Sequence, residues 1–208
     1  MTIRTTDLLK LTQWLSPAFP LSSYAYSHGL EAAMAAGRVC DAASVEAWVA
    51  CVLRRGTGAL DAWAIRAVMD GSAPEAVSDQ LRARAGCAER WEEMRAMGAA
   101  FCETTTAMGQ AHLADLPLPV ALGVRARGMD AGTVVTLYLQ AVAGQLVGAA
   151  MRFLPLGQAE AQGVLAKLHP VIEAVAARDA PAPPGGAALL AELDAMAHET
   201  LQPRIFRT

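Results

Sequence analysis

The sequence lacks the charge pattern of a nucleic-acid-binding protein and the cysteine pattern of a secreted or zinc-binding one. Its 208 residues carry a formal net charge of −3 and no long basic run, so we expect no nucleic-acid partner. Its four cysteines form no C-x-x-C pair, which argues against a zinc knuckle, a thiol redox motif and a disulfide framework. Residues 1–14 have scattered charges and no apolar run of the signal-peptide type. We therefore expect a cytoplasmic protein.

The common catalytic and nucleotide-binding motifs are also missing. The chain has no G-x-S-x-G and no H-E-x-x-H pattern, the local signatures of two large hydrolase classes. The segment RRGTGALD (Arg54–Asp61) contains G-x-G, but neither the third glycine of a dinucleotide-binding loop nor the lysine of a phosphate-binding loop. We interpret it as a helix irregularity or a contact between helices. Any nucleoside triphosphate in the function is then expected to bind another chain.

Apolar residues recur with helical spacing along almost the whole chain, and no convincing strand pattern is present. We predict an all-α fold, a multi-helix bundle with a central apolar helix, in a single domain over residues 1–208. A chain of this length buries roughly 70% of the surface that its unfolded form exposes. From caps and breakers, the helices are expected over about residues 6–17, 23–37, 44–71, 72–106 (with a break allowed), a short stretch ending at 128, 130–153, 158–178 (kinked or ended by Pro170) and a last helix ending near 198.

Two segments are expected to lie outside the helices. The stretch APAPPGG at residues 180–186 has the composition of a linker that is first stiff and then flexible. Residues 200–208 form a tail, predicted to be flexible, in which Arg204, Ile205, Phe206 and Arg207 alternate charge with apolar bulk. This tail is either a frayed terminus or a peptide that becomes ordered on a partner, with Phe206 as the anchor and the arginines facing carboxylates.

Residues 131–151 contain no formal charge, a length that could span a bilayer. Gly144 and Gly148 form a G-x-x-x-G pair, as in some membrane helices, but Gln140 and Gln145 lie near the centre of the stretch. A helix that is apolar on all sides belongs either in a membrane or in a protein core. We favour a buried core helix, in which small residues permit close approach of a neighbour, and expect no membrane association.

The segment SPAFPLSSYAYSHGLE (Ser16–Glu31) gathers hydrogen-bonding side chains in an otherwise apolar chain. If a helix starts at about residue 23, then Tyr24, Ser27, His28 and Glu31 share one face. Such a stripe suits an acid–base site, a two-ligand metal site or a polar contact surface for a partner. For these residue types alone, a hydrogen-bonded network buried between helices is the favoured interpretation.

Several separated blocks, taken in order, resemble the urease accessory protein F (UreF) family over nearly the whole chain, from about residue 8 onward. The first is the segment Ser16–Glu31, and the second is Asp61 within GALDAW. The others are AERWEEMRAMGAAF (Ala88–Phe101), PVALG (Pro119–Gly123), RFLPLGQAEAQ (Arg152–Gln162) and the terminal HETLQPRIFRT (His198–Thr208). Each block alone is weak, whereas the ordered set is specific.

This resemblance implies a non-enzymatic, chaperone-like helper in urease maturation: a cytoplasmic, all-helical protein, usually a homodimer. It implies that the chain bridges the D/H accessory protein to the nickel-carrying GTPase, protein G, modulates that GTPase and assists GTP-dependent nickel insertion into apo-urease. No cofactor would be held tightly; nickel would be in transit, and GTP would be bound by the GTPase. The residues expected to contact partners are Tyr24, Ser27, His28, Glu31, Arg152, Gln158, His198, Glu199, Arg204, Phe206 and Arg207, and none is expected to be catalytic or a metal ligand.

A competing hypothesis is a small helical hydrolase that uses His28 and Glu31 for acid–base chemistry. It predicts turnover by the isolated chain and loss of that turnover when His28 is replaced.

Overall fold

The longest helix in the described part of the chain, α8 (Ala131–Phe153), starts at a side-chain cap. The carboxylate of Asp130 accepts the backbone N–H of Thr133 at 2.8 Å, which satisfies one of the free donors of the first turn. By length and composition α8 could cross a membrane, but 56% of its most apolar window is buried within the chain. Burial against other helices is what a core position requires.

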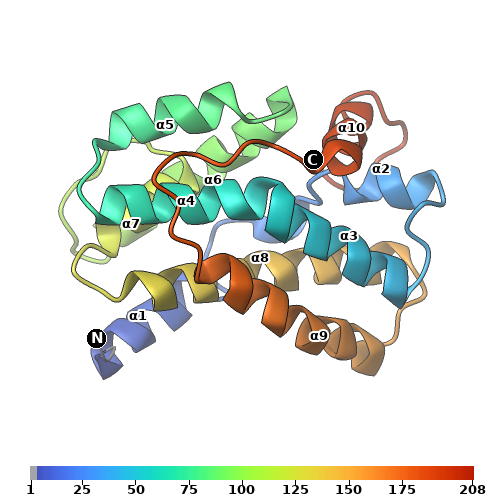
Figure 1. Ribbon diagram of the computed structural model, residues 1–208, viewed down its shortest axis with the longest axis horizontal. Coiled ribbons are helices and arrows are strands. Elements are labelled where there is room, and N and C mark those ends of the chain that lie inside the picture. The colour runs from blue at the N-terminus through green and yellow to red at the C-terminus, as the bar shows by residue number, and fades with distance from the viewer. Residues whose placement is uncertain (1–3) are drawn as a thin grey trace.

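The computed structural model describes residues 4–208, and these form an all-helical fold with no strand (Figure 1). The predicted all-α class is therefore confirmed for the described residues; residues 1–3, which the predicted domain includes, lie outside them. The remaining elements are α1 (Thr5–Trp14), the 3-10 helix η1 (Ser23–Ala25), α2 (Leu30–Ala35), α3 (Ala42–Arg55), α4 (Thr57–Met69), α5 (Pro74–Ala83), α6 (Ala88–Ala107), α7 (Leu118–Arg125), α9 (Gln158–Ala176) and α10 (Leu189–His198).

Helix α4 lies in the middle of the bundle and is buried on most of its circumference (Figure 1). It packs against α7 and α5 on one side and against α8 and α3 on the other. Helix α9 covers α8 and α3, and α10 packs on α2 at the opposite end from α1. One apolar core, which includes Trp14, Phe101 and Leu146, runs through these helices.

The helix predicted over residues 44–71 is two helices, and its predicted cap is also wrong. Asp41 is the N-cap of α3, and Ser44 is the third helical residue, whose hydroxyl returns a bond in a capping box. Gly56 leaves the helical conformation with φ −110° and ψ −140° and separates α3 from α4. A Cβ on Gly58 would lie 2.7 Å from Leu53 Cα, so α4 starts against the end of α3. The G-x-G is thus the helix irregularity that we inferred.

The helix predicted over residues 23–37 is wrong in its first half. Only η1 forms there; His28 and Gly29 have φ values of +57° and +83°, and α2 starts at Leu30. Two consecutive residues in the left-handed region end any right-handed helix. Gly29 is required at its position, because a Cβ there would lie 2.5 Å from the backbone nitrogen of Ala195 in α10. The polar stripe of one continuous helix face therefore does not exist.

The other helix predictions agree more closely with the structure. The break allowed within residues 72–106 occurs between α5 and α6. Pro170 lies inside α9 and does not end it, because the helix continues to Ala176. The stretch predicted as a linker, residues 180–186, has no helix. It is followed by Ala187, whose N–H donates to the carbonyl of Arg55 at 3.0 Å.

Candidate functional site

The carboxylate of Glu31, on α2, is the centre of a polar cluster that holds the C-terminal tail. It accepts the backbone N–H of Ile205 at 2.6 Å and that of Phe206 at 2.9 Å. One of its oxygens also lies 3.0 Å from Nε2 of His198. Glu31 is 1% exposed, and a buried carboxylate is stable only when its oxygens are satisfied in this way.

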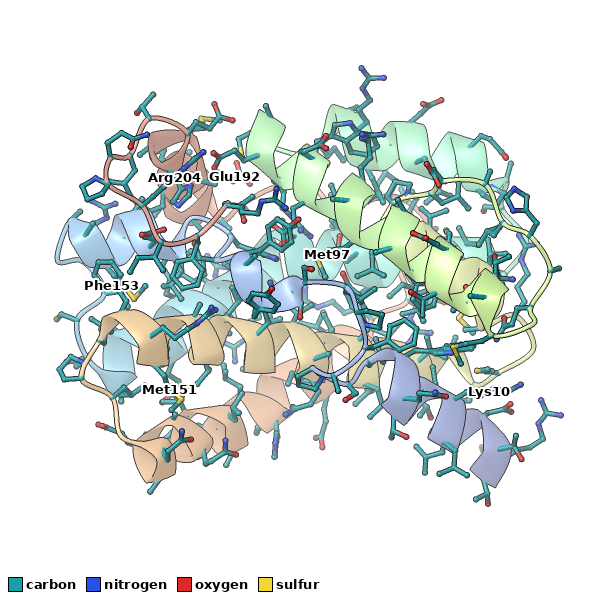
Figure 2. All side chains as sticks on the ribbon, turned by 180° about the vertical axis from the view of Figure 1, so that it is seen from behind. Lys10, Met97, Met151, Phe153, Glu192 and Arg204 are labelled. Carbon is teal, nitrogen blue, oxygen red and sulfur yellow. The ribbon has the colours of Figure 1, made fainter. Side chains whose placement is uncertain are left out.

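His198, the last residue of α10, joins this carboxylate to a second one. Its Nδ1 lies 2.7 Å from Oε2 of Glu89 on α6, and Arg204 of the tail pairs with the other oxygen of Glu89. Glu199 follows directly and caps α6, because its Oε1 accepts the backbone N–H of Ala88 at 2.8 Å. We call Glu31, Glu89, His198 and Arg204 the tail-docking cluster. Figure 2 shows Arg204 on the tail beside α10, at the same end of the molecule as Glu192.

Phe206 is the apolar anchor of the docked tail. Its ring is 2% exposed, and the guanidinium carbon of Arg152, near the end of α8, lies 4.4 Å from the ring centroid, a cation–π arrangement. The next residue, Arg207, donates its backbone N–H to the carbonyl of Ala25 at 2.7 Å. The tail thus adds contacts to η1, α2, α6 and α8.

A second buried cluster lies next to the tail and contains the ion pairs of α4 and α6. Arg90 donates to Asp61 at 2.9 Å and also pairs with Glu93 at 3.3 Å. The Tyr138 hydroxyl donates to the same oxygen of Asp61 at 2.8 Å. Nε2 of His28 lies 2.7 Å from Oε1 of Glu93. We call these five side chains the ionic cluster.

The charges of the ionic cluster set its pKa values. Burial raises the pKa of Glu93, but His28 and Arg90 outweigh that effect and bring it to about 2. Burial lowers the pKa of Arg90, yet the carboxylates of Glu93 and Asp61 raise it overall. The pKa of Asp61 is raised, because the effect of desolvation exceeds the lowering of this pKa by the charge of Arg90 and the hydrogen bond from Tyr138. Glu93 is therefore ionised and can only accept hydrogen bonds, so Nε2 of His28 carries the hydrogen in their bond.

Thr208 connects the tail to the ionic cluster. Its hydroxyl donates to Glu93 at 3.1 Å, and its carbonyl accepts the backbone N–H of Ser27 at 2.7 Å and also the Ser27 hydroxyl. Residues 25–27 and the end of the tail, residues 207–208, thus each donate one backbone N–H to the other, from Ser27 to Thr208 and from Arg207 to Ala25. The left-handed turn at His28 and Gly29 places residues 25–27 beside the tail and not in line with α2.

Known proteins with this sequence pattern share one description. The family model described as UreF matches residues 39–169. The "Urease accessory protein UreF" of Cereibacter sphaeroides is 51% identical over 206 residues, which cover 97% of this chain and 98% of that protein. The chain belongs to the UreF family. Proteins of the same description from Jannaschia sp. and Paracoccus denitrificans are 49% and 42% identical, over 99% and 96% of this chain and 96% and 95% of those proteins.

The residues that the sequence predicted to contact partners, from the resemblance to the UreF family, fall into a buried and an exposed group. Ser27, His28, Glu31, His198 and Phe206 are buried and contact other parts of the same chain. Those that stay exposed are Tyr24, Arg152, Gln158, Glu199, Arg204 and Arg207. The favoured interpretation of the polar segment, a network buried between helices, is confirmed for Ser27, His28 and Glu31, while Tyr24 is 67% exposed. The sequence predicted that Phe206 would anchor the tail on a partner and that the arginines would face its carboxylates. In the structure the contacts of Phe206 and Arg204 lie within this chain, and their contact with a partner stays a prediction.

Sequence reasoning missed the partners that complete both clusters of this UreF chain. Glu89, Arg90 and Glu93 lie on one side of α6, and Tyr138 lies on α8. The signal available was the charged start of the block Ala88–Phe101, whose acidic and basic residues recur at helical spacing. Asp61 stood out only through the resemblance.

Proposed function

We propose that this chain is an accessory protein of urease maturation with no reaction of its own. The observation that carries the proposal is the UreF match over nearly the full length, with relatives named urease accessory protein at about half identity. In this proposal the chain bridges the D/H accessory protein and the nickel-carrying GTPase G, and modulates that GTPase while nickel passes to apo-urease. Nickel is the cargo and GTP belongs to the GTPase. We further propose a cytoplasmic homodimer.

The arrangement of the tail supports a contact surface at this end of the molecule. The buried members of the two clusters hold η1, α10 and the tail in fixed relation to one another. The exposed side chains of Tyr24, Glu199, Arg204 and Arg207 are carried by these preorganised segments. Preorganisation lowers the entropy cost of binding. Tyrosine and arginine are also the side chains that contribute most often to binding energy at interfaces.

The geometry gives no comparable support to a hydrolase that uses His28 and Glu31. The two side chains have separate partners: His28 bonds Glu93, and Glu31 bonds the tail and His198. Both oxygens of Glu31 are occupied by donors, and a general base needs a free lone pair within reach of a substrate proton. Measuring turnover by the purified chain tests this alternative independently.

The bridging proposal is tested by capture of the purified D/H protein by Tyr24→Ala/Arg207→Ala. Both side chains are exposed, so we expect circular dichroism and thermal unfolding to match the wild type. The truncation of two interface anchors is expected to weaken capture at least roughly tenfold. Arg54→Ala, an exposed arginine at the end of α3, is the matched control and should bind as the wild type does. Capture by the double variant equal to that of the control would overturn the assignment of this face.

A further inference from the structure

A cavity lies between the tail, α10 and the start of α4. The centre of a water-sized sphere can occupy about 60 Å³ of it, which is room for a few water molecules or for one small molecule. Apolar side chains such as Val52, Leu60 and Ala191 form much of its wall, and Thr208 and the segment 184–186 complete it. The cavity is therefore bounded by both segments that flank α10.

Three polar side chains of the cavity wall have buried atoms without a hydrogen-bond partner among the described residues. These atoms are Nδ1 of His28, Nε of Arg90 and Oγ1 of Thr57. His28 and Arg90 are 8% and 5% exposed, and a buried polar group without a partner costs about 1–3 kcal/mol. Polar atoms of this kind, from three different segments around one space, indicate that the cavity is built to hold a hydrogen-bonding molecule.

The chemistry of the three atoms restricts that molecule. Nε of Arg90 can only donate, and so requires an acceptor such as a carbonyl oxygen. Because Nε2 of His28 donates to Glu93, Nδ1 is the ring nitrogen left for an occupant, and it accepts an N–H or O–H whenever the ring is uncharged. The Thr57 hydroxyl can serve in either direction.

The charges around the cavity favour a neutral occupant. Arg90 is already paired with Asp61 and Glu93, and Glu89 is paired with Arg204 and His198. Arg84 and Glu192 also line the cavity, but an ion bound beside Arg90 would lose its hydration, which is costly in a largely apolar site.

We propose that this cavity is a binding site for a small neutral molecule that carries a carbonyl acceptor and an N–H donor: a carboxamide or a urea. Its carbonyl accepts from Arg90, and its amide hydrogens bond Nδ1 of His28 and the Thr57 hydroxyl. Because Thr208 forms part of the wall, the occupant also stabilises the docked tail. This site is independent of the proposed bridging role.

The test is titration of the full chain with acetamide and with urea in mildly alkaline buffer, followed by heteronuclear NMR. Acetate and guanidinium serve as charged analogues of the same size. We expect saturable shifts of the amides of His28, Thr57 and Arg90 with acetamide or urea, and at least tenfold weaker binding of both ions. We also expect slower hydrogen exchange of the Arg207 amide, which bonds Ala25 across the tail contact.

Two variants separate the site from a general solvent effect. Thr57→Val removes the unpartnered hydroxyl without changing the shape, and should weaken binding several-fold. Thr136→Val makes the same change on α8, where the hydroxyl only bonds the carbonyl of Gly132 at 2.8 Å, and should leave binding unchanged. Linear, non-saturating shifts, equal binding of the two variants, or a crystal structure of a soaked crystal with water alone at the three atoms would each overturn the proposal.

Discussion

Replacing Glu31 by glutamine tests whether one carboxylate holds the tail. The native side chain accepts two hydrogen bonds, from the backbone N–H groups of Ile205 and Phe206, and its Oε2 also lies 3.0 Å from Nε2 of His198. Glutamine offers one oxygen and an NH₂ group, so whichever way the amide turns, at least one of these donors faces another donor. A hydrogen bond to a charged acceptor contributes about 1.5–3 kcal/mol, and a buried donor left facing another donor adds a further cost. We expect tail docking to weaken by about 2–4 kcal/mol.

The amide of Arg207 is the best reporter of this change, because it bonds Ala25 and not Glu31. Faster exchange there measures release of the tail as a unit, and not the loss of one bond. By exchange in the native state, we expect the Arg207 amide to exchange roughly 30-fold to several hundred-fold faster in Glu31→Gln. Core amides of α8 are expected to keep their wild-type rates.

The matched control is Glu173→Gln, which removes the same charge from an exposed position on α9. It should leave exchange in the tail unchanged. If Glu31→Gln and Glu173→Gln give the same Arg207 rate as the wild type, then Glu31 does not hold the tail and our description of the site is wrong.

Two further predictions concern the turn before α2 and the ionic cluster. Gly29→Ala should lower the free energy of unfolding by at least about 2 kcal/mol, because its Cβ would lie 2.5 Å from the Ala195 backbone nitrogen. Gly37→Ala, also at positive φ but with open space around it, should lower the free energy of unfolding clearly less. Equal losses for the two variants in denaturant unfolding would contradict the close contact at Gly29. The lowered pKa of Glu93 gives a stability contribution that is fully present above the ordinary glutamate pKa of 4.5 and is lost as pH falls toward about 2. The lowering of this pKa from 4.5 to about 2 corresponds to on the order of 3 kcal/mol. Glu93→Gln should therefore be less stable at neutral pH, and its stability should depend less on pH in this acid range. Parallel pH profiles of the variant and the wild type would show that Glu93 is not responsible.

The sequence alone was sufficient for the all-α class and for the helices whose ends carry local signals. The side chain of Asp130 caps α8 by bonding the backbone N–H of Thr133, three residues further on, and Pro74 lies at the start of α5. Such signals act over a single helical turn. The division at Gly56 was missed because the apolar spacing continues through it. The left-handed pair before α2 was missed because Ser27 and His28 are drawn to Thr208, about 180 residues further along the chain.

The polar clusters were predictable in kind but not in partners. The residue types of Ser27, His28 and Glu31 favoured a buried network, although the single helix face predicted from their spacing does not exist. The composition of the tail indicated an aromatic anchor with arginines near carboxylates. Which carboxylates these are depends on how α6 crosses α2 and the tail, and the spacing of residues within one segment carries no information about that crossing. A tail suited to a partner and a tail suited to its own chain use the same chemistry.

The most direct test of the proposed role is urease activation at limiting nickel in cells that express urease with the complete accessory set, with and without this chain. We expect little urease activity and little bound nickel in urease when the gene is deleted, and restoration of both when the chain is supplied from a plasmid. Equal activity and equal nickel content without the chain would contradict a role in urease maturation.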